Sequence, residues 1–150
     1  MDTAQQTAIF KRLKELHTRQ SECYHKLIGV LEKQQAFIGA GSEESILAHV
    51  GLGEQIIAEI FTIQKTIDPL EAMCPADMPP ETDLLAIKAT LEALNNRAMA
   101  QSEQNKMQLS QRMASVRSEI TVLGNNPIAM SARRSMYAQV STPALIDIRG

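Results

Sequence analysis

The feature that most constrains this chain is a stripe of apolar and amide positions in its first forty residues. Between residues 3 and 38 these positions recur at alternating steps of four and three, and no proline interrupts them. The average step of about 3.5 residues follows the helical turn of about 3.6, so the spacing predicts one face of a single helix. At about 1.5 Å per residue that helix is about 50 Å long, which is typical of an elongated bundle. The stripe consists of Ile9, Leu13, Leu16, Gln20, Cys23, Leu27, Val30, Gln34 and Phe37.

A second helix is predicted after the stretch GAGSEES, residues 39–45. Gly39 and Gly41 can adopt the left-handed conformation that ends a helix, and Ser42 can cap the next one. Such a short turn predicts two antiparallel neighbours. Pro69 lacks a backbone donor, so the regular helix is expected to kink or stop near Ile67. Its stripe comprises Ile46, Val50, Gly53, Ile57, Ile60, Gln64 and Ile67, widened by Leu47, Leu52, Ile56, Phe61 and Ile63.

A third helix is predicted from Thr82 to Leu123, after the linker CPADMPP and before Gly124. Both ends of this segment are rich in apolar residues, but its middle, NNRAMAQSEQNK at residues 95–106, is mainly small and polar. We therefore expect its first half to pack against the hairpin and its second half to project or to pair with another chain. The predicted fold is all-α: an elongated antiparallel three-helix bundle over residues 1–123, followed by a flexible C-terminal tail at 124–150.

Composition narrows the classes of function. Only 3% of the 150 residues are aromatic and none is tryptophan, which disfavours a sandwich or barrel. A net charge of −2 gives no basic patch, so no nucleic-acid partner is expected. The chain has no long uncharged apolar run, so no membrane span is expected. Two cysteines and no recognisable signal sequence indicate a cytoplasmic protein with reduced thiols.

Motifs for catalysis are sparse. Glu22 and His25 form one E-x-x-H, whereas di-iron bundles use two such motifs, and Ile46 stands three residues before His49. A metal–carboxylate bundle is therefore a distant alternative. Cys23 lies on the core stripe and reads as a structural thiol; Cys74, in the proline linker, has no recognisable activating partner. We expect no enzymatic activity, no cofactor and no metal.

The tail, residues 124–150, carries many apolar residues although Pro127 and Pro143 break any regular element. The tail carries three arginines and one aspartate, so its net charge is positive and suits an acidic or mixed partner surface. A segment that cannot bury its apolar residues alone can bury them against a partner, or it can fold back over the third helix. The candidate partner-binding residues are Leu109, Met113, Val116, Ile120, Leu123, Met136 and Tyr137.

Two stretches, LIGVLEKQQAFIGAGSEESILAHVGLGEQIIAEIFTIQKTI and NNRAMAQSEQNKMQLSQRMASVRSEITVL, resemble the FlgN-type flagellar export chaperones. The resemblance implies a cytoplasmic chaperone that binds hook–filament junction proteins before secretion, without a cofactor. It also implies that the C-terminal region captures a helical client segment, and that a tail tyrosine, Tyr137 here, docks on an export-gate membrane protein. Lys65 is the only lysine of the second helix, which departs from the family, and the FliT-type chaperones stay an alternative. A different reading is a structural or adaptor coiled-coil protein that forms a homodimer through its third helix.

Overall fold

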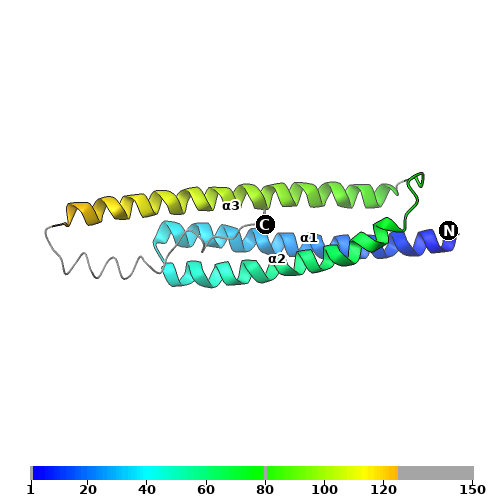
Figure 1. Ribbon diagram of the computed structural model, residues 1–150, viewed down its shortest axis with the longest axis horizontal. Helices are drawn as coiled ribbons and strands as arrows, with labels where there is room; N and C mark the ends of the chain where they lie inside the picture. The colour runs from blue at the N-terminus through cyan, green and yellow to red at the C-terminus, as the bar shows by residue number, and fades with distance from the viewer. Residues whose placement is uncertain (1, 80, 125–150) are drawn as a thin grey trace.

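The computed structural model describes residues 2–79 and 81–124, and within them the chain forms three long α-helices (Figure 1). Helix α1 spans Thr3–Ala40, α2 spans Glu43–Ala72 and α3 spans Thr82–Val122. No strand occurs in these described residues. The predicted all-α three-helix bundle is confirmed, and its expected boundaries differ from the observed ones by only a few residues.

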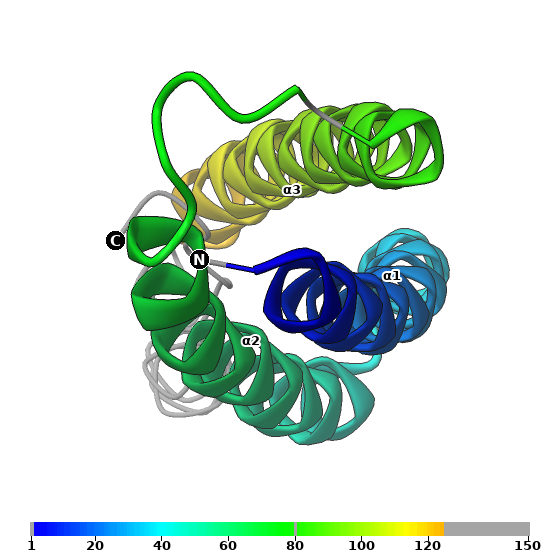
Figure 2. The same cartoon turned by 90° about the vertical axis from the view of Figure 1, so that its right-hand side faces the viewer.

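The three helices lie along one long axis, and the chain reverses its direction between α1 and α2 and again between α2 and α3 (Figure 1). α2 is antiparallel to α1, whereas α3 is parallel to α1, because α3 pairs with successive parts of α1 in the same order. Lys14 contacts Glu81 near one end, and Gln35 contacts Gln101 further along. α1 packs along both other helices, while α2 and α3 meet at only a few points (Figure 2). The bundle is therefore an open array with α1 as the shared member.

Local signals define the ends of α1. The Asp2 carboxylate accepts a hydrogen bond of 2.8 Å from the backbone of Gln5, whose side chain accepts one of 3.1 Å from the backbone of Asp2. This reciprocal pair satisfies two donors that a helix start leaves free. At the other end Gly41 has φ 74°, the left-handed conformation that favours glycine. A Cβ there would also lie 2.6 Å from Arg112 Nη2, so a larger residue at this position would require the Arg112 side chain of α3 to move.

Of the two outcomes expected for α2 near Ile67, a kink or a stop, the stop is wrong, because the helix continues through Pro69 to Ala72. Proline removes one backbone donor but leaves its carbonyl free to accept. The Pro69 carbonyl does accept a hydrogen bond of 3.2 Å from the amide of Met73. This hydrogen bond completes the last turn of α2. Glu71 lies in that turn, close to α3.

The predicted stripe of α1 forms the core, with only Phe37 half-buried. Each Leu or Ile fully buried there stabilises the fold by roughly 1.5–3 kcal/mol. The main cluster comprises Ile9, Leu13, Leu16, Cys23, Leu27, Ile28, Val30 and Leu31 of α1, Ile56, Ile60, Ile63 and Ile67 of α2, and Leu84, Leu94 and Ala98 of α3. A second cluster, at the end of the bundle where α1 turns into α2, comprises Ile38, Ile46, Val50 and Leu109, with Phe37 and Met113 packed against it.

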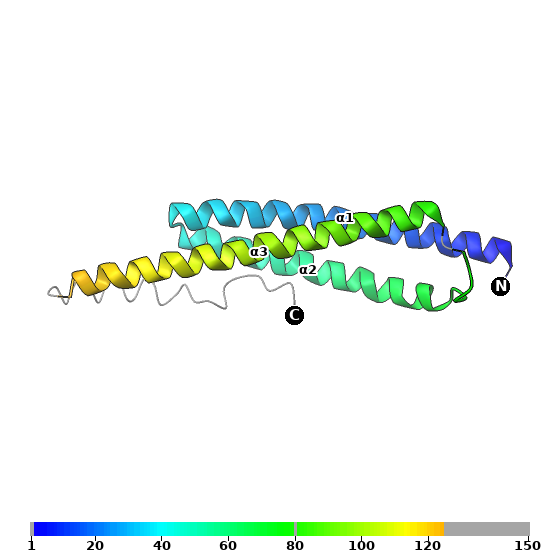
Figure 3. The ribbon, with the colours of Figure 1, turned by 90° about the horizontal axis from the view of Figure 1, so that it is seen from above.

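The polar middle of α3 is held firmly, contrary to the expectation that only the first half packs. Ala98, Ser102 and Asn105 are all buried. The Asn105 amide donates to Leu31 O at 2.9 Å and to Gln34 Oε1 at 3.1 Å. Small side chains allow the two backbones to approach, and the amide hydrogen bonds remove the cost of burying polar atoms. Only the last turns of α3 extend past the α1–α2 turn (Figure 3).

The outward side of α2 is unexpectedly apolar. Leu47, Leu52 and Phe61, which were expected to widen the core stripe, are exposed instead. Helix α2 is also long and apolar enough, by length and composition, to cross a membrane: one 18-residue window has a mean hydropathy of 1.4 and is 33% buried. Counting uncharged runs missed this window because isolated glutamates interrupt it. A core helix of a bundle passes the same test.

Candidate functional site: a groove between α2 and α3

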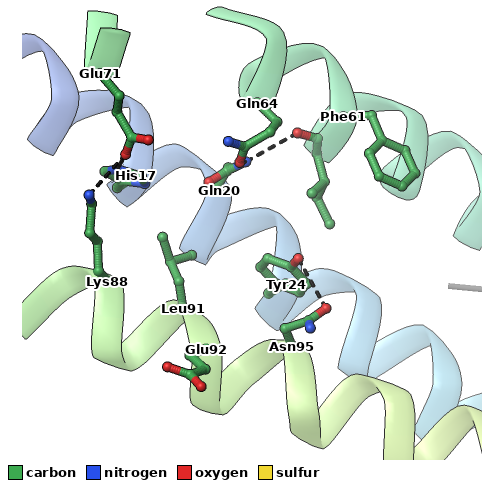
Figure 4. Close-up of a pocket in the computed structure, with 11 residues that line it drawn as sticks. His17, Gln20, Tyr24, Phe61, Gln64, Glu71, Lys88, Leu91, Glu92 and Asn95 are labelled. Atoms are coloured by element: carbon green, nitrogen blue, oxygen red, sulfur yellow. Dashed lines mark hydrogen bonds and ion pairs between the residues drawn. The ribbon is translucent and has the colours of Figure 1, made fainter. Parts of the chain in front are cut away.

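A groove of about 380 Å³ lies where α2 and α3 stay apart over α1 (Figure 4). Its volume falls in the range of about 300–1,000 Å³ that is common for ligand sites. All three helices contribute to its lining. The lining residues are His17, Gln20 and Tyr24 of α1, Ile60, Phe61, Gln64 and Glu71 of α2, and Lys88, Leu91, Glu92 and Asn95 of α3.

Amide groups on the floor of the groove join the helices. Gln20 Nε2 donates to Ile60 O at 3.2 Å and to Gln64 Oε1 at 2.9 Å, which links α1 to α2. On the other side, the Tyr24 hydroxyl donates to Asn95 Oδ1 at 3.2 Å, which links α1 to α3. Burial raises the pKa of Tyr24. The phenol therefore stays protonated and keeps its donor role at neutral pH.

One end of the groove is closed by a charged bridge between its two walls. Lys88 Nζ of α3 lies 2.9 Å from Glu71 Oε1 of α2. Both side chains are partly exposed, so solvent screens the attraction and its contribution to stability is small. A smaller hollow of about 200 Å³ shares Glu71 and Lys88 with the groove and is lined by Cys74 and Met78 near the linker. The ion pair therefore separates two openings on this side of the molecule.

His17 lies beneath that bridge as a buried polar side chain with few partners. Its Nε2 atom is 3.6 Å from Glu71 Oε1, which exceeds hydrogen-bond distance, and neither ring nitrogen has a hydrogen-bond partner in the described part of the chain. Burial lowers the pKa of His17, although nearby Gln20 and Glu71 partly oppose this effect. The ring is therefore neutral at physiological pH, with two polar atoms close to the groove.

The groove combines apolar walls with amide, hydroxyl and carboxylate groups, which suits recognition of a side chain or a peptide segment. Phe61 is half-exposed at one edge, and Leu91 is half-buried on the opposite wall (Figure 4). Residues 2–79 and 81–124 hold no group of three or more His, Cys, Asp or Glu side chains that could bind a metal ion. The lining thus offers hydrogen bonds and apolar contacts.

The candidate partner-binding residues on α3 lie in different environments. Leu109 is 4% exposed within the turn-end cluster, so the expectation that the chain leaves it uncovered is wrong. Met113 packs against the same cluster, and Val116 is buried. Ile120 and Leu123 are half-buried near the projecting end of α3. The other two, Met136 and Tyr137, lie outside the described residues.

The residues weighed for catalysis are placed apart from the groove. Glu22 and His25 are both exposed on α1, and the His49 ring packs against Phe37 with centroids 4.8 Å apart and the ring planes tilted by 57°. Cys23 is buried, as predicted for a structural thiol, and burial raises its pKa. Cys74 is half-buried, and its thiol donates to Leu70 O at 3.6 Å.

Sequence reasoning missed the groove altogether. Its polar residues are spread over three helices, and no local motif joins them. Gln20 and Gln64 carried the available signal, because an amide on an apolar stripe must find a partner when it is buried. Both residues stand on their stripes, and they bond to each other.

Comparisons with known proteins give one relative of undefined activity. No family model matches the chain. No solved structure matches it either. An uncharacterized protein of Treponema pallidum (strain Nichols) is 29% identical over 119 residues, which cover 79% of this chain and 77% of that protein. The chain is thus similar to that protein over most of both lengths, and the relative's description transfers no activity to it.

Proposed function

We propose that this protein is a carrier of helical protein segments, acting as a FlgN-type flagellar export chaperone for hook–filament junction proteins before their secretion. The observation that carries the proposal is the open groove in which α2 and α3 stand apart on α1. The sequence resemblance supplies the client class. On this proposal the chain works in the cytoplasm without a cofactor and delivers its client to an export-gate protein.

A client helix suits the groove because it can contact both walls at once. Phe61 and Leu91 offer apolar surface at opposite edges, and an amphipathic helix laid between them would add a fourth member to the bundle. The amides of Gln64 and Asn95 have partners within the protein already, so they can stay satisfied when water is displaced. The groove is therefore prepared for a largely apolar ridge rather than for a strongly charged ligand.

The end of α3 extends the proposed client surface beyond the hairpin. Val122 is 80% exposed, and Ile120 and Leu123 are half-buried beside it. Met136 and Tyr137 stay proposed anchors in the tail, with Tyr137 also proposed to dock on the export gate. Leu109 is better assigned to the core that supports this end. Ordering a tail on binding costs free energy, which keeps affinity moderate and suits a carrier that must release its client.

The groove is tested by placing one charge on its wall. Leu91→Glu should weaken binding of a hook–filament junction protein about tenfold or more, equivalent to about 1.4 kcal/mol, because the client's apolar ridge would face a carboxylate. Leu85→Glu is the matched control, since Leu85 is exposed on the same helix and does not line the groove. Titration calorimetry measures both. No binding by the native chain, or equal affinities of the two variants, would contradict the proposal.

A second variant separates the tail from the groove. Removing residues 125–150 should also lower the affinity, and unchanged affinity would take Met136 and Tyr137 out of the client site. The exposure of Val122 favours one other function, an adaptor that self-associates through the ends of its third helices. In that case Val122→Glu abolishes a dimer, and the native chain shows no affinity for junction proteins.

A further inference from the structure

His17 is a buried polar side chain that the groove leaves without a hydrogen bond. Neither of its ring nitrogens has a partner among the described residues. The charged groups that act on the ring come from the two neighbouring helices, Glu71 from α2 and Lys88 from α3 (Figure 4). On its own helix the close neighbour is Gln20, whose amide carries no charge. A positive charge on His17 can therefore be balanced only by Glu71, the one carboxylate among these groups.

One oxygen of Glu71 lies between two basic side chains. Glu71 Oε1 is 2.9 Å from Lys88 Nζ and 3.6 Å from His17 Nε2. Because the longer distance exceeds hydrogen-bond reach, Lys88 holds the carboxylate while His17 is neutral. The Glu71 side chain is 38% exposed, so it has room to move toward the ring. The two basic groups therefore compete for one acceptor.

Burial determines which partner Glu71 takes once His17 is protonated. The Lys88 side chain is 43% exposed, so water can solvate its ammonium group when Glu71 leaves. The His17 side chain is only 6% exposed, so water cannot solvate a charge on its ring in the same way. An exposed ion pair contributes little to stability, whereas an uncompensated buried charge costs far more. We therefore expect Glu71 to leave Lys88 for a charged His17.

Lys88 has a second carboxylate close by on its own helix. Glu92 stands four residues further along α3 and lines the same groove. It forms no ion pair with a described residue. Side chains four residues apart on a helix are neighbours, so a released Lys88 ammonium can pair with Glu92. Each of the four charged groups thus has a partner after the exchange.

We propose that His17, Glu71 and Lys88 form a proton-controlled latch at this end of the groove. Protonation makes both ring nitrogens donors, so His17 Nε2 donates to Glu71 and the Glu71–Lys88 pair separates. That pair forms the boundary between the groove and the smaller hollow near the linker. Its separation joins the two openings into one longer groove.

The latch regulates client binding, a consequence that rests on the proposed function. Apart from Glu71 and Lys88, the hollow is lined mainly by apolar side chains, among them Phe10, Leu13 and Met78. With the latch open, the apolar ridge of a client can extend past the bridge and bury more surface. Client affinity should therefore rise as the pH falls and His17 becomes charged.

Nuclear magnetic resonance of the full-length protein tests the latch without a client, by following the ring signals of His17 through a pH titration. Burial lowers the pKa of His17, and each variant should move that pKa in a defined direction. Glu71→Gln should lower it further, because the charged ring loses its acceptor. Lys88→Gln should raise it, because Glu71 loses its competing partner. Glu54→Gln, which changes an exposed carboxylate of α2 outside the groove, should leave it unchanged.

Combining the two variants distinguishes competition from independent electrostatic effects. If the two basic groups compete, Lys88→Gln should raise the pKa of His17 less when Glu71→Gln is already present. Equal shifts in the two backgrounds would mean that Lys88 acts on the ring directly, and this result overturns the latch. A pKa of His17 that does not respond to Glu71→Gln overturns it as well. Circular dichroism verifies that each variant keeps its helices.

Titration calorimetry with a hook–filament junction protein tests the regulation. About one pH unit below the measured pKa of His17, the native chain should bind about fivefold or more tightly than at about one unit above it. His17→Gln gains no proton in this range, so its affinity should change much less. An equal response of the two proteins overturns the regulation. A native chain that binds no junction protein contradicts the proposed function, whereas the latch is decided by the resonance measurements on the free protein.

Discussion

Along the middle of α3, polar side chains are buried against α1, while on the outward side of α2 apolar side chains face solvent. Asn105 is 1% exposed, whereas Phe61 is 49% exposed. The difference follows from geometry rather than from composition. A small or amide side chain can be buried when a neighbouring backbone comes close enough to bond with it. An apolar side chain stays exposed when its helix, packed on α1 alone, has a second face that nothing in the described bundle covers.

The largest expected effect concerns the buried amide. Asn105→Ala should lower the free energy of unfolding by about 2–3 kcal/mol, because Gln34 and Gln101 lose their shared partner inside the α1–α3 contact. Urea denaturation measures the change. Gln104→Ala, at the exposed neighbouring position, should change stability by less than about 0.5 kcal/mol. Equal effects of the two variants would break the contrast between the two regions.

A smaller effect of opposite sign is expected on the outward side of α2. Gly51→Ala should raise the unfolding free energy of the monomer by about 0.5–1 kcal/mol, because alanine is the better helix former and its Cβ meets open space. Gly29→Ala on α1 is the matched comparison, since a Cβ there also meets no atom within 4 Å. Thermal unfolding of the three proteins measures the change. A loss of stability at Gly51 alone would mean that this face is not open.

The smallest effect concerns His17. Its buried ring nitrogens have no hydrogen-bond partner in the described part of the chain, whereas the buried amide of Asn105 has partners. Burial lowers the pKa of His17 below its ordinary value of 6.5, which the unfolded chain retains. Between the two values the unfolded state binds more protons, so stability falls as the pH drops below 6.5 and is level above it. His17→Gln should remove this part of the slope, whereas His25→Gln, at an exposed site, should keep it. Urea denaturation at a series of pH values compares the three proteins.

Sequence patterns were sufficient to predict the helices, the tight turn and the core face of α1. These features depend on residues close in the chain, and the periodicity of α1 repeats over many turns. The burial of Asn105 was not predictable in the same way. It depends on α3 running parallel to α1 with one register, which brings Asn105 beside Leu31 and Gln34. A hydrophobicity pattern treats that segment as solvent-facing.

The groove could not be predicted because it is a property of spacing between helices. Gln20 and Gln64 signalled that the stripes needed polar partners, but not that α2 and α3 would stay apart. The proposed client residues on α3 differ in burial for a related reason. Leu109 was expected to lack cover within the chain, yet it packs in the cluster with Ile38 of α1 and Val50 of α2.

The position of α1 between its two neighbours has a consequence for how the molecule opens. Since α2 and α3 share few contacts, the two long seams that they form with α1 are separate cooperative units. Detachment of α3 leaves the α1–α2 hairpin joined by its own turn, with the 73–81 linker as the pivot. The width of the groove between α2 and α3 can therefore change through movement of α3 alone, while α1 and α2 stay packed together.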